Sequence, residues 1–300
     1  MENIKQNSTR AWLLASRPKT LTGAAVPVMI ALALAYTDAT ASFNPLSASL
    51  CVLFAFIMQI DANFINDYFD FVKGNDDETR LGPERACSMG WVTASAMRKA
   101  IALTTLIACG VGLPLIWYGG WEMIAVGIFC VIFCFLYTTH LSYRGLGDVL
   151  VLVFFGIVPV CITYYIQTGT VTPEVFVASL CCGFVIDTLL IVNNFRDIDN
   201  DRAKGKITLI VRVGRNGGLM LYRLAGILPF VIGLMYLYTG RPAAFGLPAI
   251  YFVMHMMTAK KMQAIGRGRE LNMVLGATAR NMFIYGLLLS GGILISYFCS

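Results

Sequence analysis

Two segments of the chain place carboxylates and cations at helical spacing directly after long apolar runs. The first covers residues 66–85 (NDYFDFVKGNDDETRLGPER), and the second covers residues 193–209 (NNFRDIDNDRAKGKITL). Oxygen donors on one helix face suit Mg²⁺, which takes one or two carboxylates, keeps several waters and completes its shell with phosphate oxygens. Interleaved Lys and Arg residues suit the phosphate itself. The two segments therefore indicate a site for a Mg²⁺-bridged diphosphate.

The first segment is expected to continue the preceding helix past Ile65. Residues three or four apart then project from one helix face. Carboxylates this close repel one another unless a cation lies between them. Asp76 and Asp77 follow a turn at Gly74 and extend the cluster. The other candidates here are the oxygen donors Asn63, Asn66, Asp67 and Asp70 and the phosphate-binding cations Lys73, Arg80 and Arg85.

The second segment repeats this pattern at the end of another apolar run. Asn193 or Asn194 is followed by Asp197 and Asp201 at steps of three or four residues. The alternative is that these are solvated charges that only anchor a helix end. Basic residues alone suffice for membrane topology, however, so clustered acids favour a functional site. Positive charge beside them comes from Arg196, Lys204 and Lys206.

The composition indicates a polytopic membrane protein. Hydrophobic residues make up 57% of the 300 residues and charged residues only 13%, which is far from the average of soluble proteins. A helix needs roughly 20 apolar residues to cross the hydrocarbon core, and nine runs reach or approach that length. We expect an all-α bundle of nine transmembrane helices that forms one domain over residues 1–300, with spans at 21–36, 46–65, 101–118, 123–137, 149–166, 175–192, 219–238, 245–257 and 282–298.

The basic residues indicate the orientation of this bundle. Lys and Arg accumulate in short cytoplasmic loops, and all 23 of them except Arg241 lie in the N-terminal tail, in the even-numbered connections or at the adjacent helix ends. This bias predicts a multi-pass protein of the cell inner (cytoplasmic) membrane, with a cytoplasmic N-terminus and both acidic segments on the cytoplasmic side. It also accounts for the net charge of +6, so nucleic-acid binding is not expected.

Cysteine and histidine do not indicate a further metal site. Eight of the nine cysteines lie within or at the ends of apolar runs, and none forms a Cys-x-x-Cys pair, so we interpret them as packing residues. The two histidines, His140 and His255, are too few for a histidine-based site.

The acidic motifs resemble those of the UbiA superfamily of intramembrane prenyltransferases. Its Asn-Asp-x-x-Asp motif matches residues 66–70, and its Asp-x-x-x-Asp motif matches residues 197–201. Gly74 stands where many members carry a further Asp, and Asp76 follows two residues later. Other motifs are similar to the branch that prenylates 1,4-dihydroxy-2-naphthoate in menaquinone synthesis. They are Arg-Pro-Lys-Thr-Leu at 17–21, Arg-x-Gly-Pro-x-Arg at 80–85, Gly-Leu-Gly-Asp at 145–148, Phe-Phe-Gly at 154–156, Asn-Asn-x-Arg-Asp at 193–197 and Gly-Lys-x-Thr-Leu at 205–209.

This resemblance implies a UbiA-type bundle that catalyses electrophilic aromatic substitution. Mg²⁺ would neutralise charge on the departing diphosphate of a polyprenyl diphosphate. The ring of 1,4-dihydroxy-2-naphthoate would attack the allylic cation at its carboxyl-bearing carbon and lose CO₂, which gives a demethylmenaquinol. The isoprenoid tail would stay in membrane lipid, and the helices would keep water from the cation.

The same resemblance assigns roles to the motif residues. The implied catalytic residues and metal ligands are Asp67, Asp70, Asp197 and Asp201, with Asp76 as an additional metal ligand. Three basic residues, Arg17, Lys19 and Arg144, are candidates for binding the carboxylate of the acceptor, and each also suits a role as a topological anchor. Substrate binding is assigned to Asn63, Asn66, Lys73, Arg80, Arg85, Asn194, Arg196 and Lys206.

Two other functions share parts of this pattern. A sister prenyltransferase would use 4-hydroxybenzoate, homogentisate or a porphyrin, and the choice of acceptor and the release of CO₂ distinguish it. A membrane transporter would also contain acidic sites. Transporters usually place charged residues near the membrane midplane on interrupted helices, whereas these acids are expected at one membrane face.

Overall fold

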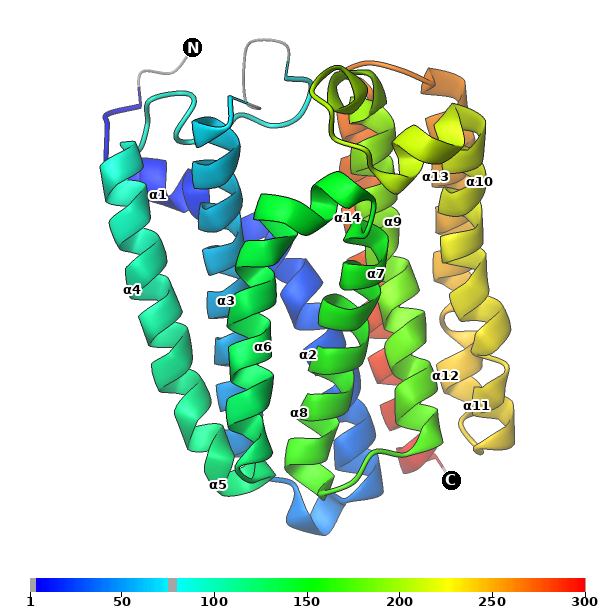
Figure 1. Ribbon diagram of the computed structural model, residues 1–300. Coiled ribbons are helices and arrows are strands. Elements are labelled where there is room, and N and C mark those ends of the chain that lie inside the picture. The colour runs from blue at the N-terminus through cyan, green and yellow to red at the C-terminus, as the bar shows by residue number, and fades with distance from the viewer. Residues whose placement is uncertain (1–3, 75–79, 300) are drawn as a thin grey trace.

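The chain is folded as a bundle of long helices (Figure 1). The computed structural model describes residues 4–74 and 80–299, and these residues contain no β-strand. The α-helices are α1 (Thr9–Ser16), α2 (Leu21–Asp38), α3 (Pro45–Val72), α4 (Ala94–Gly112), α5 (Ile116–Gly119), α6 (Glu122–Leu136), α7 (Gly147–Val151), α8 (Val158–Thr168), α9 (Pro173–Ala203), α10 (Leu209–Ile232), α11 (Met235–Tyr238), α12 (Pro242–Gly246), α13 (Ala249–Ile265) and α14 (Leu271–Phe298).

Nine helical segments of the described residues are long and apolar enough to cross a membrane. Several of them combine two helices, namely α1 with α2, α4 with α5, α7 with α8, α10 with α11, and α12 with α13. The predicted all-α polytopic membrane protein with nine spans is therefore confirmed. Because the number of spans is odd, α1 and the end of α14 lie at opposite ends of the bundle (Figure 1). The end of the bundle where α1 lies is here called the α1 end.

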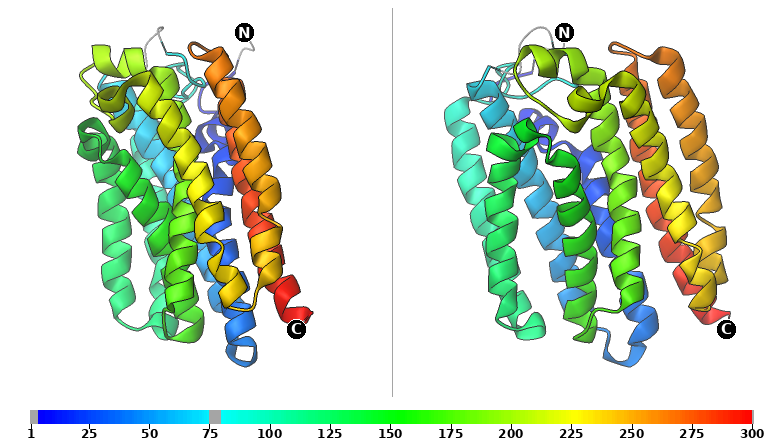
Figure 2. Two further views of the ribbon diagram at one scale, coloured as in Figure 1. Left: turned by 90° about the vertical axis from the view of Figure 1, so that its right-hand side faces the viewer. Right: turned by 45° about the vertical axis from the view of Figure 1, so that its right-hand side comes forward.

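Both acidic segments continue long helices, as their spacing predicts. The Asn44 side chain caps the start of α3 by accepting two backbone N–H groups, and Thr172 caps the start of α9. Neither helix stops where its apolar run ends, because α3 continues to Val72 and α9 to Ala203. Asp67, Asp70, Asp197 and Asp201 therefore lie on helix ends, and the longer connections gather at the same α1 end (Figure 2).

Helix α9 is central to the bundle. It packs against α2, α7, α8, α10 and α14, and the largest apolar core lies where α2, α8, α9 and α14 meet. A separate core joins α1, α3, α4 and the loop that follows α3. The two helices that carry the acidic segments thus belong to different cores, and the space between them is available for a site.

Two π-helical segments flank the short helix α7. The first, η4 (Tyr137–Leu141), follows α6, and the second, η6 (Leu152–Ile157), separates α7 from α8. Such turns are rare, and they occur frequently at functional sites. The Gly-Leu-Gly-Asp motif therefore lies between two irregular segments of helix.

Glycine at position 156 allows η6 to lie directly against α9. A Cβ atom there would lie 2.6 Å from the Ser179 carbonyl oxygen and 2.9 Å from the Gly183 Cα. Backbone atoms cannot yield as a flexible side chain can, so an added carbon would force the two segments apart. Backbone contact thus explains the glycine of the Phe-Phe-Gly motif.

The substitution Gly156→Ala is expected to lower the unfolding temperature of the purified protein in detergent. Overpacking of this kind costs about 1–3 kcal/mol. Gly110→Ala on α4 is the matched control, since a Cβ atom there meets no other atom within 4 Å. An equal effect of the two substitutions would contradict the assigned contact between η6 and α9.

Candidate active site

Two adjoining cavities lie between the helices. The polar cavity has a volume of about 210 Å³, and the apolar cavity has a volume of about 1010 Å³. They are continuous, because both are lined by Arg17, Asn66, Tyr137, Thr138, Leu190 and Asn193. The charged and amide side chains of the polar cavity are Arg17, Asn66, Asp70, Arg85, Asp148, Asn193, Asn194 and Lys206.

The polar residues of α3 form two stripes that face in different directions. Asn66 and Asp70, four residues apart, line the polar cavity. Asn63 and Asp67 are also four residues apart, but they line neither cavity. Asn63 instead donates a hydrogen bond of 2.9 Å to the Ser16 carbonyl. One stripe therefore faces the site, and the other packs against neighbouring backbone.

The Asp67 carboxylate holds the loop that follows α3. Its two oxygens accept the backbone N–H groups of Ala86 at 2.9 Å and Cys87 at 2.8 Å, and the Arg17 guanidinium lies 3.7 Å away. The residue is only 1% exposed. Because both oxygens are engaged by the protein, the geometry favours a structural role for Asp67. Its role as a metal ligand stays a prediction.

On α9 a buried arginine organises the second acidic segment. Arg196 is 1% exposed and donates to Asp197 at 2.8 Å and to Asn193 at 2.7 Å. Its third nitrogen donates to Asn272 of α14 at 2.8 Å. Asn272 in turn donates to the Leu81 carbonyl at 2.8 Å. Arg196 therefore joins α9, α14 and the loop after α3, and it does not line the polar cavity.

The loop after α3 lies directly on this arginine. A Cβ atom at Gly82 would lie 2.7 Å from Arg196 Nη2, which explains the glycine of the Arg-x-Gly-Pro-x-Arg motif. Within the same loop, Arg80 Nε donates to the Pro83 carbonyl at 2.9 Å. Arg80 lines neither cavity, so its predicted contact with substrate finds no support in this geometry.

Lys73 is held outside both cavities. Its Nζ donates to the Thr139 carbonyl at 2.7 Å and lies 4.3 Å from the centre of the Tyr143 ring. Burial lowers the pKa of Lys73, and the nearby Asp70 carboxylate raises it in part. The contacts connect the end of α3 to η4, and the predicted role in substrate binding stays a prediction.

Two predicted phosphate-binding cations do face the polar cavity. They are Arg85 and Lys206. Arg85 lies 3.8 Å from the Asp70 carboxylate, and Lys206 lies 3.4 Å from that of Asp201. One cation thus comes from each acidic segment, which brings both segments to the same cavity.

One carboxylate of α9 lies within electrostatic reach of α3. Asp201 interacts electrostatically with Asp197 on its own helix and with Asp70 of α3. Its Oδ2 is buried without a hydrogen-bond partner among residues 4–74 and 80–299. Neither Asp197 nor Asp201 lines the cavity directly. The predicted ligand Asp76 lies outside the described residues.

This set of donors fits Mg²⁺. Within the described parts of the chain, no three acidic, histidine or cysteine side chains group closely enough to enclose a metal ion by themselves. Mg²⁺ usually takes one or two protein carboxylates and fills its shell with water and phosphate. Asp70 lines the polar cavity together with the Asn66 and Asn194 amides, and the unpartnered Asp201 oxygen lies outside this lining but within electrostatic reach of Asp70.

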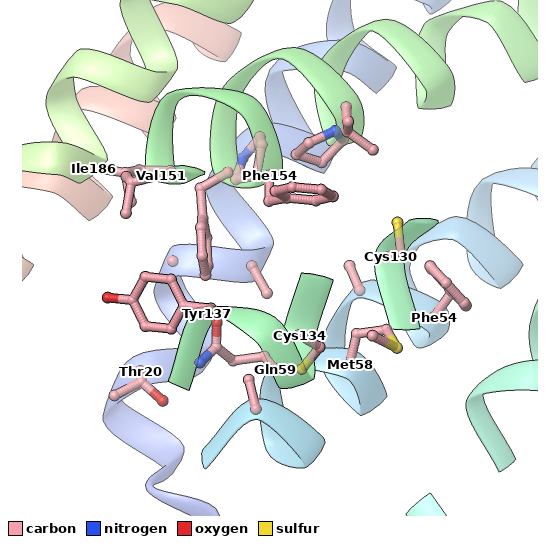
Figure 3. A pocket seen from close by; sticks show the side chains of 18 of the residues that line it. Thr20, Phe54, Met58, Gln59, Cys130, Cys134, Tyr137, Val151, Phe154 and Ile186 are labelled. Carbon is pink, nitrogen blue, oxygen red and sulfur yellow. The ribbon is translucent and has the colours of Figure 1, made fainter. Parts of the chain in front are cut away.

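The apolar cavity continues from the polar one along the inside of the bundle. Figure 3 shows Val151 and Phe154 on one wall and Phe54, Met58 and Cys130 on the opposite wall. A space of this size lined mainly by aliphatic and aromatic side chains suits a long hydrocarbon chain. Together the two cavities suit an amphiphile with an anionic head and an apolar tail.

Comparison with known proteins agrees with this geometry. The model of the UbiA prenyltransferase family matches residues 24–294. The chain belongs to the UbiA prenyltransferase family. It resembles the 1,4-dihydroxy-2-naphthoate octaprenyltransferase of Escherichia coli strain K12, with 37% identity over 69% of either chain. A protein of the same name from Haemophilus influenzae is 31% identical over 95% of this chain and 96% of its own.

Solved UbiA structures share the fold. The apo structure of a UbiA homolog from Aeropyrum pernix K1 has a TM-score of 0.70 at 14% identity, covering 91% of this chain and 97% of its own. A UbiA homolog from Archaeoglobus fulgidus bound to GPP and Mg²⁺ has a TM-score of 0.67 at 12% identity, covering 93% and 99%. The predicted UbiA-type prenyltransferase bundle is therefore confirmed.

Among the three candidates for the acceptor carboxylate, Arg17 has the best position in the UbiA site. It lines both cavities, whereas Lys19 lines only the apolar one and Arg144 lines neither. Arg17 also has φ of 50°, a left-handed conformation that residues other than glycine adopt infrequently and that clusters at functional sites. The Arg-Pro-Lys-Thr-Leu motif therefore contributes a cation at the junction of the cavities.

Sequence reasoning missed several residues of the site. Tyr137 and Thr138 line both cavities, and the Thr138 hydroxyl donates to the Asn66 amide oxygen. Nothing in the spacing around them signals this position. Asn272 was not found either, because no motif lies near it. Asp148 was recognised as part of the Gly-Leu-Gly-Asp motif but was given no role, although it is an acid at the start of an apolar run.

Asp67→Asn and Asp70→Asn are expected to impair the protein in different ways. Asp67→Asn turns one acceptor oxygen into an amide group that faces a backbone N–H, so the free energy of unfolding should fall by about 2–3 kcal/mol. Asp70→Asn should leave the fold intact and lower turnover by orders of magnitude, because it removes charge from the cavity. Thermal unfolding and prenyl-transfer rates measure the two effects. Equal unfolding temperatures for the two variants would refute the loop-holding role of Asp67.

Proposed function

We propose that the chain transfers a polyprenyl group from polyprenyl diphosphate to 1,4-dihydroxy-2-naphthoate with loss of CO₂, giving demethylmenaquinol and diphosphate. The observation that carries this proposal is a cavity of carboxylates and cations that opens into a long apolar cavity. The names of the relatives in Escherichia coli and Haemophilus influenzae support the choice of acceptor.

The polar cavity suits the diphosphate of the donor. Arg85 and Lys206 line this cavity, and they would contact phosphate oxygens with charge-assisted hydrogen bonds. Asp70, Asp201 and the Asn66 amide would hold Mg²⁺, and the Archaeoglobus fulgidus homolog bound to GPP and Mg²⁺ supports this requirement. When bound, the ion neutralises charge on the departing diphosphate.

The allylic carbon of the donor belongs at the junction of the two cavities. With the diphosphate in the polar cavity and the isoprenoid tail in the apolar one, the bond that breaks lies near Tyr137 and Leu190, which line both. The Tyr137 ring offers a π face to a developing cation. The apolar walls keep out water that would otherwise quench this cation.

The acceptor is an anion, and Arg17 is the cation we assign to its carboxylate. Arg17 lines both cavities, so a carboxylate bound there keeps the aromatic ring beside the junction. A guanidinium binds a carboxylate through two parallel hydrogen bonds, which also orients the ring. Attack at the carboxyl-bearing carbon then needs no base to remove a ring proton, because CO₂ leaves from that carbon.

The distribution of basic residues supports a place in the cell inner membrane with the α1 end in the cytoplasm. Arg241 lies at the opposite end, between α11 and α12, and forms ion pairs with Asp38 and, at 3.3 Å, with Glu174. Because Arg241 is paired with these two carboxylates, it is only weak evidence against this orientation.

Labelled CO₂ is expected to appear at one equivalent per prenyl group transferred when carboxyl-labelled 1,4-dihydroxy-2-naphthoate, a polyprenyl diphosphate and Mg²⁺ are supplied. The reason is that the prenyl group bonds to the ring carbon that bears the carboxyl group, so the carboxyl carbon leaves as CO₂. Mass spectrometry of the product and trapping of CO₂ measure the two quantities. Chelation of Mg²⁺ should abolish both.

The opposite result would identify a sister enzyme. Retention of the label in the prenylated product, or faster reaction with 4-hydroxybenzoate, would overturn the assigned acceptor and leave the fold and the polar cavity in place. The same assay with homogentisate completes the comparison.

Lys206→Ala is expected to raise the KM for polyprenyl diphosphate about tenfold or more while the KM for the aromatic acceptor changes little. Its ammonium group faces the polar cavity, and an ionic hydrogen bond to phosphate is worth about 1.5–3 kcal/mol. Lys260→Ala is the matched control, because Lys260 is exposed on α13 and lines neither cavity. Equal diphosphate KM values for the two variants would remove Lys206 from the donor site.

A further inference from the structure

Besides Asp70, one more carboxylate lines the polar cavity. Asp148 of α7 lines this cavity and is 7% exposed. Both of its carboxylate oxygens are buried without a hydrogen-bond partner among the residues that the structure describes. Burial of an unpartnered carboxylate is costly, and it persists in a site when a ligand supplies the missing donor.

A second carboxylate lies behind the first. Asp187 of α9 is 6% exposed, interacts electrostatically with Asp148 and lines neither cavity. Its Oδ1 also lacks a partner within the described chain. Two neighbouring buried carboxyl groups repel one another when both are charged. This pair is therefore suited to accept a hydrogen bond and to take up a proton.

The position of Asp148 coincides with the place where the ring must react. Val151, one turn after Asp148, lines the apolar cavity, and Leu190, one turn after Asp187, lines both cavities. The pair is therefore level with the junction between the two cavities. The charged groups that share the polar cavity with Asp148 are Arg17, Asp70, Arg85 and Lys206, and the Tyr137 hydroxyl is the uncharged titratable group there.

We propose that Asp148, supported by Asp187, binds the phenolic hydroxyl next to the carboxyl group of the aromatic acceptor and carries its proton through the reaction. This inference rests on the proposed function. A hydroxyl and a carboxyl group on adjacent ring carbons point to the same side of the ring. Arg17 and Asp148 line one cavity, so they can hold the two groups together. A carboxylate without a donor is the natural partner of a phenolic O–H.

The proton transfer balances within one turnover. The carboxyl-bearing ring carbon forms a bond to the allylic carbon, and the neighbouring C–OH becomes C=O as its proton passes to Asp148. The product of this step is a β-keto carboxylate, a class of compound that loses CO₂ readily. When the bond to CO₂ breaks, its electron pair restores the aromatic ring, and the oxygen takes the proton back from Asp148. No other base, oxidant or reductant is required.

The test compares two acceptors, 1,4-dihydroxy-2-naphthoate and its 1-methyl ether, which cannot donate the proton. Asp148→Asn should lower kcat with the dihydroxy compound about 100-fold, the lower end of general acid–base contributions. The ether should react slowly in both proteins, and its rates in the wild-type protein and in Asp148→Asn should differ by no more than about twofold. Asp148→Glu should recover part of the activity with the dihydroxy compound. The KM for polyprenyl diphosphate should stay unchanged throughout.

Asp61→Asn is the matched control. Asp61 is equally buried, but it accepts hydrogen bonds from Thr104 and Thr105 and lines neither cavity. This variant should keep the wild-type difference in rate between the two acceptors. If Asp148→Asn does not fold, Asp187→Asn provides the second test, and it should impair reaction of the dihydroxy compound more than that of the ether.

Three results would overturn the assignment. Equal loss on both acceptors would make Asp148 a structural residue, and a raised diphosphate KM with a raised Mg²⁺ requirement would make it a metal ligand. Binding of the two acceptors without the prenyl donor, measured by naphthoate fluorescence, is a readout that needs no turnover. If the wild-type protein binds the dihydroxy compound more tightly than the ether and Asp148→Asn keeps this preference, the role is also refuted. Absence of prenylated product from the wild-type protein would instead count against the proposed function.

Discussion

The site depends on one buried arginine more than on any other group. Arg196 bonds to Asp197 and Asn193 on its own helix and to Asn272 of α14, and its guanidinium lies under Gly82. A buried charge that loses its partners costs several kcal/mol, so Arg196 holds the ends of α9 and α14 and the loop after α3 together. The loop is then held at its other end by Asp67, which accepts the N–H groups of Ala86 and Cys87. Arg85, between these anchors, is thereby kept at the polar cavity.

This arrangement divides the acidic motifs between two tasks. Along α3, Asn66 and Asp70 face the cavity, while Asn63 and Asp67 hold the N-terminal segment and the loop. Residues 66 and 67 are adjacent in the chain, yet one helical step of about 100° separates their directions. A motif that resembles a set of metal ligands can therefore contain a residue that instead accepts hydrogen bonds from the backbone and holds a loop in place. The same division occurs on α9, where Arg196 neutralises Asp197 and leaves Asp201 with an unpartnered oxygen.

Much of the fold could be predicted because hydrophobic length and basic-residue bias are strong signals in membranes. The extension of α3 and α9 beyond their apolar runs followed from the spacing of Asp70 and Asp201. The direction of each side chain could not be predicted, because spacing of three or four residues defines a broad face and not the neighbour that this face meets. Asn272 and Thr138 reach the site from distant parts of the chain, and no local pattern marks them. The glycines at 82 and 156 were recognised as motif residues, but their reason, close approach of Arg196 and of α9 backbone, is visible only in three dimensions.

The boundary between the two cavities explains why irregular helix occurs where it does. Residues 137–157 belong to two spans separated by a turn at Gly145 and Leu146, and within the second span η6 changes the helical register between α7 and α8. Close contact of Gly156 with α9 brings this shifted helix against Gly183, one turn before Asp187. Asp187 interacts electrostatically with Asp148, which lines the polar cavity one turn before Val151 of the apolar one. Charge at that depth would be a liability in a helix that faced lipid, and both side chains are buried inside the bundle.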